Sequence, residues 1–96
     1  MTDELPELAE LRDEIDRLDG EIAALVADRI HVTEEVARVK SRAGVGLVDT
    51  DRERAVHAQY EAVFRDNDLP ESQGNALATF LIELALQRER TVQAES

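Results

Sequence analysis

The chain contains no cysteine, which excludes disulfide bonds and thiolate metal sites. Aromatic residues make up only 3% of it, so a core has to be built from Leu, Ile, Val and Ala. No apolar run approaches the roughly 18 to 20 residues that a membrane-spanning helix needs. No signal peptide is recognisable, and no third metal ligand accompanies the spaced His–Glu pairs. We therefore expect a cytoplasmic protein that binds no metal and does not act at a membrane.

Basic residues are also scarce. The 11 Lys and Arg residues face 22 Asp and Glu residues, and the formal net charge is −11. This balance argues against nucleic acid as a partner, because phosphate binding needs a basic surface. An acidic chain with almost no lysine resembles the cytosolic proteins of halophilic archaea, so we expect a halophilic source. A length of 96 residues with 43% apolar residues indicates a single domain over residues 1–96.

The spacing of the apolar residues predicts an all-α fold. Steps of three and four residues predict a first helix over about residues 6–42 that buries one stripe. The stripe consists of Leu8, Leu11, Ile15, Leu18, Ile22, Leu25, Val32, Val36 and Val39. A capping box of Thr50 and Glu53 predicts a second helix over about 50–66, and a third helix over about 70–92 follows. No segment alternates for long enough to be a strand.

The length of the first helix predicts an intertwined helical homodimer. About 36 residues span about 54 Å at 1.5 Å per residue. A compact monomer of this size has a radius of gyration of about 12–13 Å. The helix therefore overhangs its own domain, and part of its apolar stripe stays in water unless a second copy covers it. The alternative is a monomer in which the first helix breaks, most readily at Gly20.

Charged residues occupy positions where this pattern expects apolar ones. Arg29 follows Leu25 by four residues, and Lys40, the only lysine in the chain, follows Val36 by four. Cations on an inward face need an anionic or hydrogen-bonding partner. Each could pair with an internal carboxylate, but two of them on one line favour a site for an anionic ligand.

The later helices add charged residues of both signs. Asp49, Arg52 and Glu53 lie at the start of the second helix, where unpaired backbone N–H groups attract anions. Helix capping explains the two acidic residues equally well. In the third helix Glu89 follows Ala85 by four residues, so it also faces inward.

Four segments together resemble the AroQ class of chorismate mutases, an all-helical dimeric family. They are residues 8–19 (LAELRDEIDRLD), 25–30 (LVADRI), 36–40 (VARVK) and 49–54 (DTDRER). The resemblance covers nearly the whole chain. It implies an isomerase that converts chorismate to prephenate in phenylalanine and tyrosine biosynthesis without a cofactor. It also implies that the long first helices of two protomers pair and that each active site borrows from the partner.

The resemblance assigns a role to each basic residue of the first helix. Arg12 would reach across the dimer to a substrate carboxylate, whereas Arg29 would bind a carboxylate from its own chain. Lys40 would donate hydrogen bonds to the ether oxygen and to a carboxylate of the substrate.

The same comparison assigns the remaining candidates. Glu53 and the backbone N–H of Asp49 would hold the ring hydroxyl, and Arg52 would support the anionic substrate. Ala85 stands where a serine often contacts the ring carboxylate. Glu89 stands where a glutamine usually donates to the ether oxygen.

The chemistry of this reaction fits the composition. An intramolecular [3,3] rearrangement needs no nucleophile, metal or redox group; it needs a dianion held in a compact shape and charge stabilised on the ether oxygen. One alternative is an isochorismate pyruvate-lyase on the same fold, which would bind a similar dianion. Another is a non-catalytic dimeric regulatory module, which explains the apolar stripe but not the inward charges.

Overall fold

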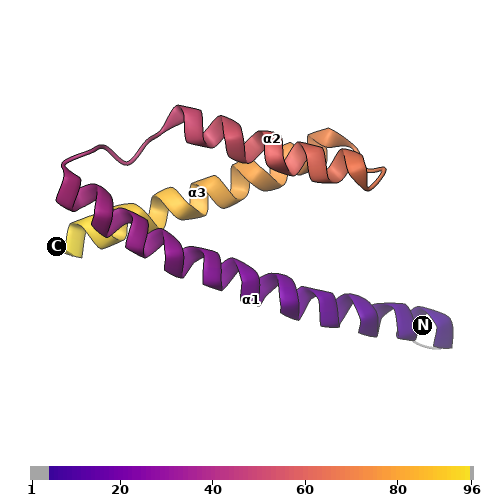
Figure 1. Cartoon of the computed structure of the whole chain (residues 1–96). Coiled ribbons are helices and arrows are strands. Elements are labelled where there is room, and N and C mark those ends of the chain that lie inside the picture. Colours follow the sequence, from indigo (N-terminus) through magenta and orange to yellow (C-terminus); the bar gives the residue numbers. More distant parts are fainter. Residues whose placement is uncertain (1–4, 96) are drawn as a thin grey trace.

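The computed structural model describes residues 5–95, which form three helices and no strand (Figure 1). Helix α1 spans Pro6–Ala43, α2 spans Thr50–Asp66 and α3 spans Glu71–Glu95. The prediction of an all-α fold with three helices is confirmed. None of these helices is both long enough and apolar enough to cross a membrane.

Helix α1 is continuous over 38 residues, with a proline in its first turn. It passes through Gly20 without a break, so the alternative of a broken first helix is wrong. It ends at Gly44, which has a φ of 69°, a left-handed conformation that glycine adopts without strain. The N–H of Val45 then donates to the carbonyl oxygen of Lys40 at 3.1 Å, and the chain turns back toward α2.

Helix α2 starts with a different cap from the predicted one. The N-cap residue is Asp49, whose carboxylate accepts a hydrogen bond from the backbone N–H of Arg52 at 3.0 Å. Thr50 is already the first helical residue, so the predicted capping box of Thr50 and Glu53 is wrong. The physical reason is that aspartate caps helices somewhat better than threonine does, and here it precedes Thr50 directly.

Helix α3 packs against both other helices, whereas α1 and α2 lie apart from each other within residues 5–95 (Figure 1). Gly74 allows α3 to approach α2 closely, because a Cβ atom there would lie 2.6 Å from the carbonyl oxygen of Tyr60. Few apolar residues of the described chain are buried, and two of them are alanines. They are Ala37, Val56, Ala78, Leu81 and Val92.

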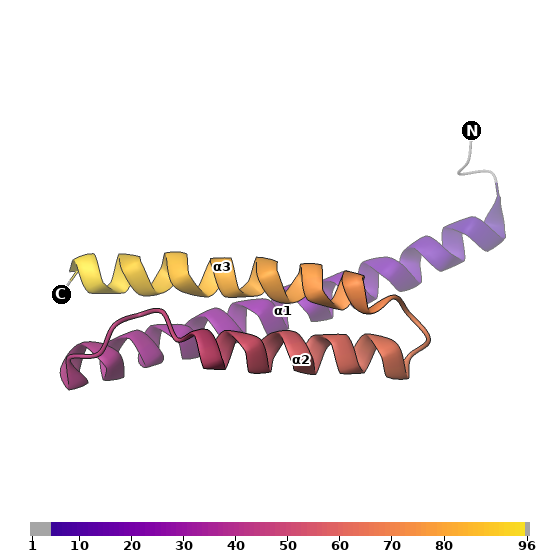
Figure 2. The ribbon, with the colours of Figure 1, turned by 90° about the horizontal axis from the view of Figure 1, so that it is seen from above.

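The N-terminal half of α1 projects beyond α2 and α3 (Figures 1 and 2). The radius of gyration is 17.5 Å, well above the roughly 12–13 Å of a compact monomer of this length. The predicted stripe is therefore not buried within one chain, and its side chains on the projecting half are 44–68% exposed. They are Leu11, Ile15, Leu18, Ile22 and Leu25.

Candidate active site

A pocket of about 220 Å³ lies among the three helices near the end where α1 turns into α2. Seven of the eight predicted site residues line it: Arg29, Lys40, Asp49, Arg52, Glu53, Ala85 and Glu89. The rest of its wall is mostly apolar: Val32, Thr33, Val36, Leu47, Val56, Ile82 and Leu86. The pocket thus joins three cations to a largely apolar wall.

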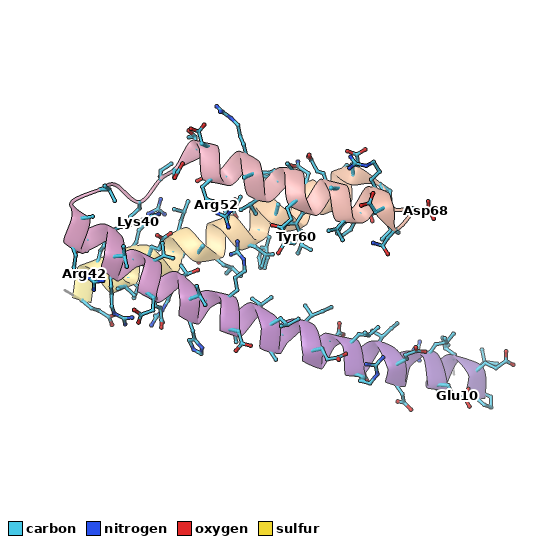
Figure 3. The ribbon with its side chains drawn as sticks, in the orientation of Figure 1. Glu10, Lys40, Arg42, Arg52, Tyr60 and Asp68 are labelled. Atoms are coloured by element: carbon cyan, nitrogen blue, oxygen red, sulfur yellow. The ribbon has the colours of Figure 1, made fainter. Side chains whose placement is uncertain are left out.

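Lys40 projects from the last turns of α1 beneath the α1–α2 connection (Figure 3). Its Nζ donates to the carbonyl oxygen of Leu47 at 2.6 Å and to Glu89 Oε1 at 3.0 Å. The turn at Gly44 allows this arrangement, because it folds the connection back over the lysine. An ammonium group has three N–H donors, so one remains for a ligand.

Glu89 is the partner of Lys40 and comes from α3. It is 4% exposed, and the Lys40 side chain is 21% exposed. A buried carboxylate is costly unless it is paired, which explains why the two charges meet here. Lys40 therefore has the internal carboxylate partner that the sequence left open, and the ion pair itself forms part of the pocket wall.

Arg29 lies three turns before Lys40 on α1. Its Nη1 donates to the carbonyl oxygen of Leu81 at 3.3 Å, which ties the guanidinium to α3. That bond uses one of five N–H donors, and the planar fork suits bidentate binding of a carboxylate. Thr33, buried beside it, satisfies its hydroxyl by donating to the carbonyl oxygen of Arg29 at 3.0 Å.

The first turn of α2 forms the opposite wall of the pocket. The carboxylate of Asp49 is engaged in the helix cap, so a ligand would meet this residue through its backbone. Figure 3 shows Arg52 on α2 at the same end of the molecule as Lys40. Glu53 is half-buried beside it, and Ala85 of α3 adds a methyl group.

Arg12 is the predicted site residue that the structure does not bring to this pocket. It lies near the start of α1, close to Glu10 at the far end of the helix in Figure 3. Arg12 and Arg29 are 17 positions apart, or about 26 Å along a continuous helix. Arg12 therefore cannot reach the pocket of its own chain.

The sequence did not predict some of the residues that line the pocket. Leu47 contributes a backbone carbonyl, for which no side-chain signal exists. Ile82 and Leu86 could have been found, because they lie seven and three residues before Glu89 on the same helical face. Two large apolar residues of α3, Leu77 and Phe80, are 39% and 57% exposed.

The arrangement as a whole can bind a small polyanion between cations and apolar walls. No group of three or more His, Asp or Glu side chains placed to hold a metal occurs in the part of the chain that the structure describes. The cations and apolar walls of the pocket are suited to binding, orienting and charge stabilisation.

Comparison with known proteins shows that the chain is similar to chorismate mutases. Residues 11–90 match the model of the family described as chorismate mutase type II. A chorismate mutase of Methanocaldococcus jannaschii is 30% identical over 87 residues, which cover 88% of each chain. An intracellular chorismate mutase of Mycobacterium tuberculosis is 35% identical over 80 residues, covering 83% of this chain and 70% of that protein. A bifunctional chorismate mutase/prephenate dehydratase of Aquifex aeolicus is 36% identical over 63 residues, only 17% of its length.

The family model spans most of the chain, from α1 to α3, and includes every predicted site residue. The relative from Methanocaldococcus jannaschii matches it nearly end to end. On these grounds, and with a pocket suited to a small polyanion, the chain belongs to the chorismate mutase type II family.

Proposed function

We propose that this chorismate mutase rearranges chorismate to prephenate in the pocket of about 220 Å³, and that a second copy of the chain completes each site. The observation that carries this proposal is the convergence of Arg29, Lys40 and Arg52 on one largely apolar pocket of a chain whose net charge is −11. The substrate is a dianion, and guanidinium and ammonium groups at the wall of one small pocket are the donors that bind carboxylates. We also propose that residues 1–96 form one domain.

The reaction breaks one C–O bond and forms one C–C bond within a single molecule. The protein therefore has two tasks: to hold the reactive conformation and to stabilise the charge that develops on the ether oxygen. Arg29 binds one substrate carboxylate through its guanidinium fork. Lys40 donates its remaining N–H to the ether oxygen and approaches a carboxylate of the substrate.

The other side chains of the pocket orient the substrate. Glu53 and the backbone N–H of Asp49 hold the ring hydroxyl, and Arg52 balances the negative charge of the substrate. Ala85 contributes only a methyl group, so the ring carboxylate lacks a hydroxyl donor from this position. Glu89 faces the ether oxygen beside Lys40.

A homodimer follows from the same reasoning. The apolar side chains on the projecting half of α1 are exposed. A second α1 packed against this face would remove it from water, with a stabilisation of roughly 25 cal/mol per Å² of apolar surface. Arg12 of the partner subunit would then reach a pocket that it cannot reach in its own chain.

The substitutions Leu18→Glu and Ile22→Glu test the dimer. Both side chains lie on the exposed stripe, at 44% and 57% exposure, and a charge there opposes burial against a second helix. We expect monomers by sedimentation equilibrium and loss of most chorismate turnover, because each site then lacks the partner's Arg12. Ala24→Glu adds the same charge on the opposite, exposed face of α1 and should leave both properties unchanged. A Leu18→Glu chain that stays dimeric and active would contradict the shared site.

A second prediction concerns the hydrogen bonds of Glu89. Its Oε1 accepts from Lys40 Nζ at 3.0 Å, and an ionised carboxylate has no donor to offer to the ether oxygen. Glu89→Gln supplies an N–H donor at this position and should raise kcat. Steady-state kinetics of both chains decide this, with Glu83→Gln, an exposed carboxylate on the same helix, as the control. An unchanged kcat in Glu89→Gln would show that Lys40 acts without a donor from this position.

We also propose a pathway, a cellular compartment and a kind of source organism. We place the reaction in phenylalanine and tyrosine biosynthesis, in the cytoplasm of a halophilic archaeon. The 22 acidic residues and the single lysine of the sequence support adaptation to salt, and the mycobacterial relative carries the word intracellular in its name. Ultraviolet measurement of chorismate loss at molar salt tests the activity directly. The same assay with isochorismate tests the lyase alternative, for which pyruvate release would be the signature.

A further inference from the structure

A second ion pair joins α1 to α3 beside the pair of Lys40 and Glu89. The Nε of Arg88 donates to Glu34 Oε2 at 2.5 Å. The Glu34 side chain is 18% exposed and that of Arg88 is 40% exposed, and neither residue lines the pocket. Here α1 supplies the acid and α3 the base, which is the opposite polarity to the neighbouring pair.

The two pairs flank the place where α1 has a fully buried alanine. Ala37 lies three residues after Glu34 and three before Lys40, and it is 0% exposed. A methyl group permits two helices to approach closely, but it forms only a shallow ridge and gives little resistance to sliding or rotation. The ion pairs on either side of Ala37 can therefore fix the position and rotation of α3 against α1, which the packing of the alanine does not fix.

The reversed polarity makes this register unique. A shift or rotation of α3 against α1 that brought Arg88 toward Lys40, or Glu89 toward Glu34, would place like charges together. Arg88 and Glu89 are also consecutive in the chain, so holding one fixes the backbone that carries the other. While substrate engages the remaining N–H of Lys40, the pair of Glu34 and Arg88 holds α3 in place.

We propose that Glu34 and Arg88 are positioning residues for the reaction: they hold α3 on α1 so that Glu89 and Lys40 stay aligned while substrate is bound. This role rests on the proposed function of the pocket. Neither residue touches the substrate, so their removal should disturb the alignment of the reacting groups more than the binding of the substrate.

The test is a double-variant cycle on these two residues. Glu34→Gln and Arg88→Gln should each lower kcat by about 3- to 10-fold, because small misplacements of catalytic groups are costly. KM should change by less than about twofold. The double variant should be no slower than either single one, since both remove the same interaction. Thermal unfolding of each variant shows whether a loss of kcat merely follows a loss of folded chain.

A matched control lies one residue away. Glu35 accepts a hydrogen bond from Arg38 within α1 at 2.7 Å, with side chains 70% and 48% exposed. Glu35→Gln and Arg38→Gln make the same changes of charge in a pair whose two members both lie on α1, and we expect wild-type kcat from both. If Arg88→Gln does not fold, Arg88→Lys keeps the charge but lacks the Nε donor that Glu34 accepts from, and its kcat should still fall.

The outcomes separate the positioning role from the activity itself. A wild-type chain that does not turn over chorismate removes the proposed function and this role together. With an active wild type, unchanged kcat in both single variants overturns the positioning role alone. Losses that multiply in the double variant, or that appear equally in the Glu35 and Arg38 controls, also overturn it, because they indicate independent or general effects of charge.

Discussion

Replacing Lys40 with alanine is expected to lower kcat by roughly 10²–10³, which corresponds to about 2.7–4 kcal/mol of lost transition-state stabilisation. Its Nζ is held by the carbonyl oxygen of Leu47 and by Glu89, and so is already oriented before substrate arrives. The charge that it meets on the ether oxygen develops mainly in the transition state. The loss should therefore appear in kcat more than in KM.

The ion pair complicates this experiment and also supplies its control. Lys40→Ala leaves Glu89 without its partner at 4% exposure, which is costly for the fold as well as for the reaction. The double variant Lys40→Ala/Glu89→Gln removes the orphaned charge, and it should recover thermal stability without recovering kcat. Steady-state kinetics on both variants at equal folded concentration make the measurement. A Lys40→Ala chain within a few-fold of wild type would remove this residue from the active site.

Mixing two inactive chains is expected to restore activity. Arg12→Ala and Arg29→Ala should each abolish most turnover, since each removes a carboxylate contact from every site of a homodimer. In a heterodimer of the two, one site keeps Arg29 of its own chain and Arg12 of the partner subunit, while the other site loses both. About half of wild-type activity per heterodimer should return after the chains are dissociated and reassociated together.

A second mixture provides the control. Arg29 and Lys40 line one pocket of a single chain, so a heterodimer of Arg29→Ala and Lys40→Ala has one defect in each site. That mixture should stay inactive although it assembles equally well. If the Arg12 mixture also stays inactive while heterodimers are detected by native mass spectrometry, Arg12 does not act across the dimer.

The sequence patterns predicted the helical fold well because the apolar period is regular and few prolines or glycines interrupt it. They placed the start of α2 at Thr50, as observed, but not its cap, since Asp49 and Thr50 both suit a cap and the chemical difference between them is small. The length of the first helix also predicted that part of its apolar stripe lies in water within one chain, and Ile15 and Leu18 on that stripe are 55% and 44% exposed.

Some features of the site could likewise be predicted from the sequence, and others could not. The positions of Lys40 and Glu89 on inward helical faces could be deduced from spacing, but their direct contact across 49 residues could not. The carbonyl oxygen of Leu47 carries no signal in the sequence, because every residue has a carbonyl. The ion pair of Glu34 and Arg88 could not be predicted from the sequence either, because the chain has many charged residues and any two of them could have paired.

The thin core has a consequence for how this chain exists in the cell. The buried apolar residues of α1–α3 within residues 5–95 are five, two of them alanines, so a single copy removes little apolar surface from water. If a second copy supplies the missing burial, folding and association become one equilibrium. Dilution would then unfold the protein as well as dissociate it, and the expression level of the gene would set the fraction of chains that possess an active site at all.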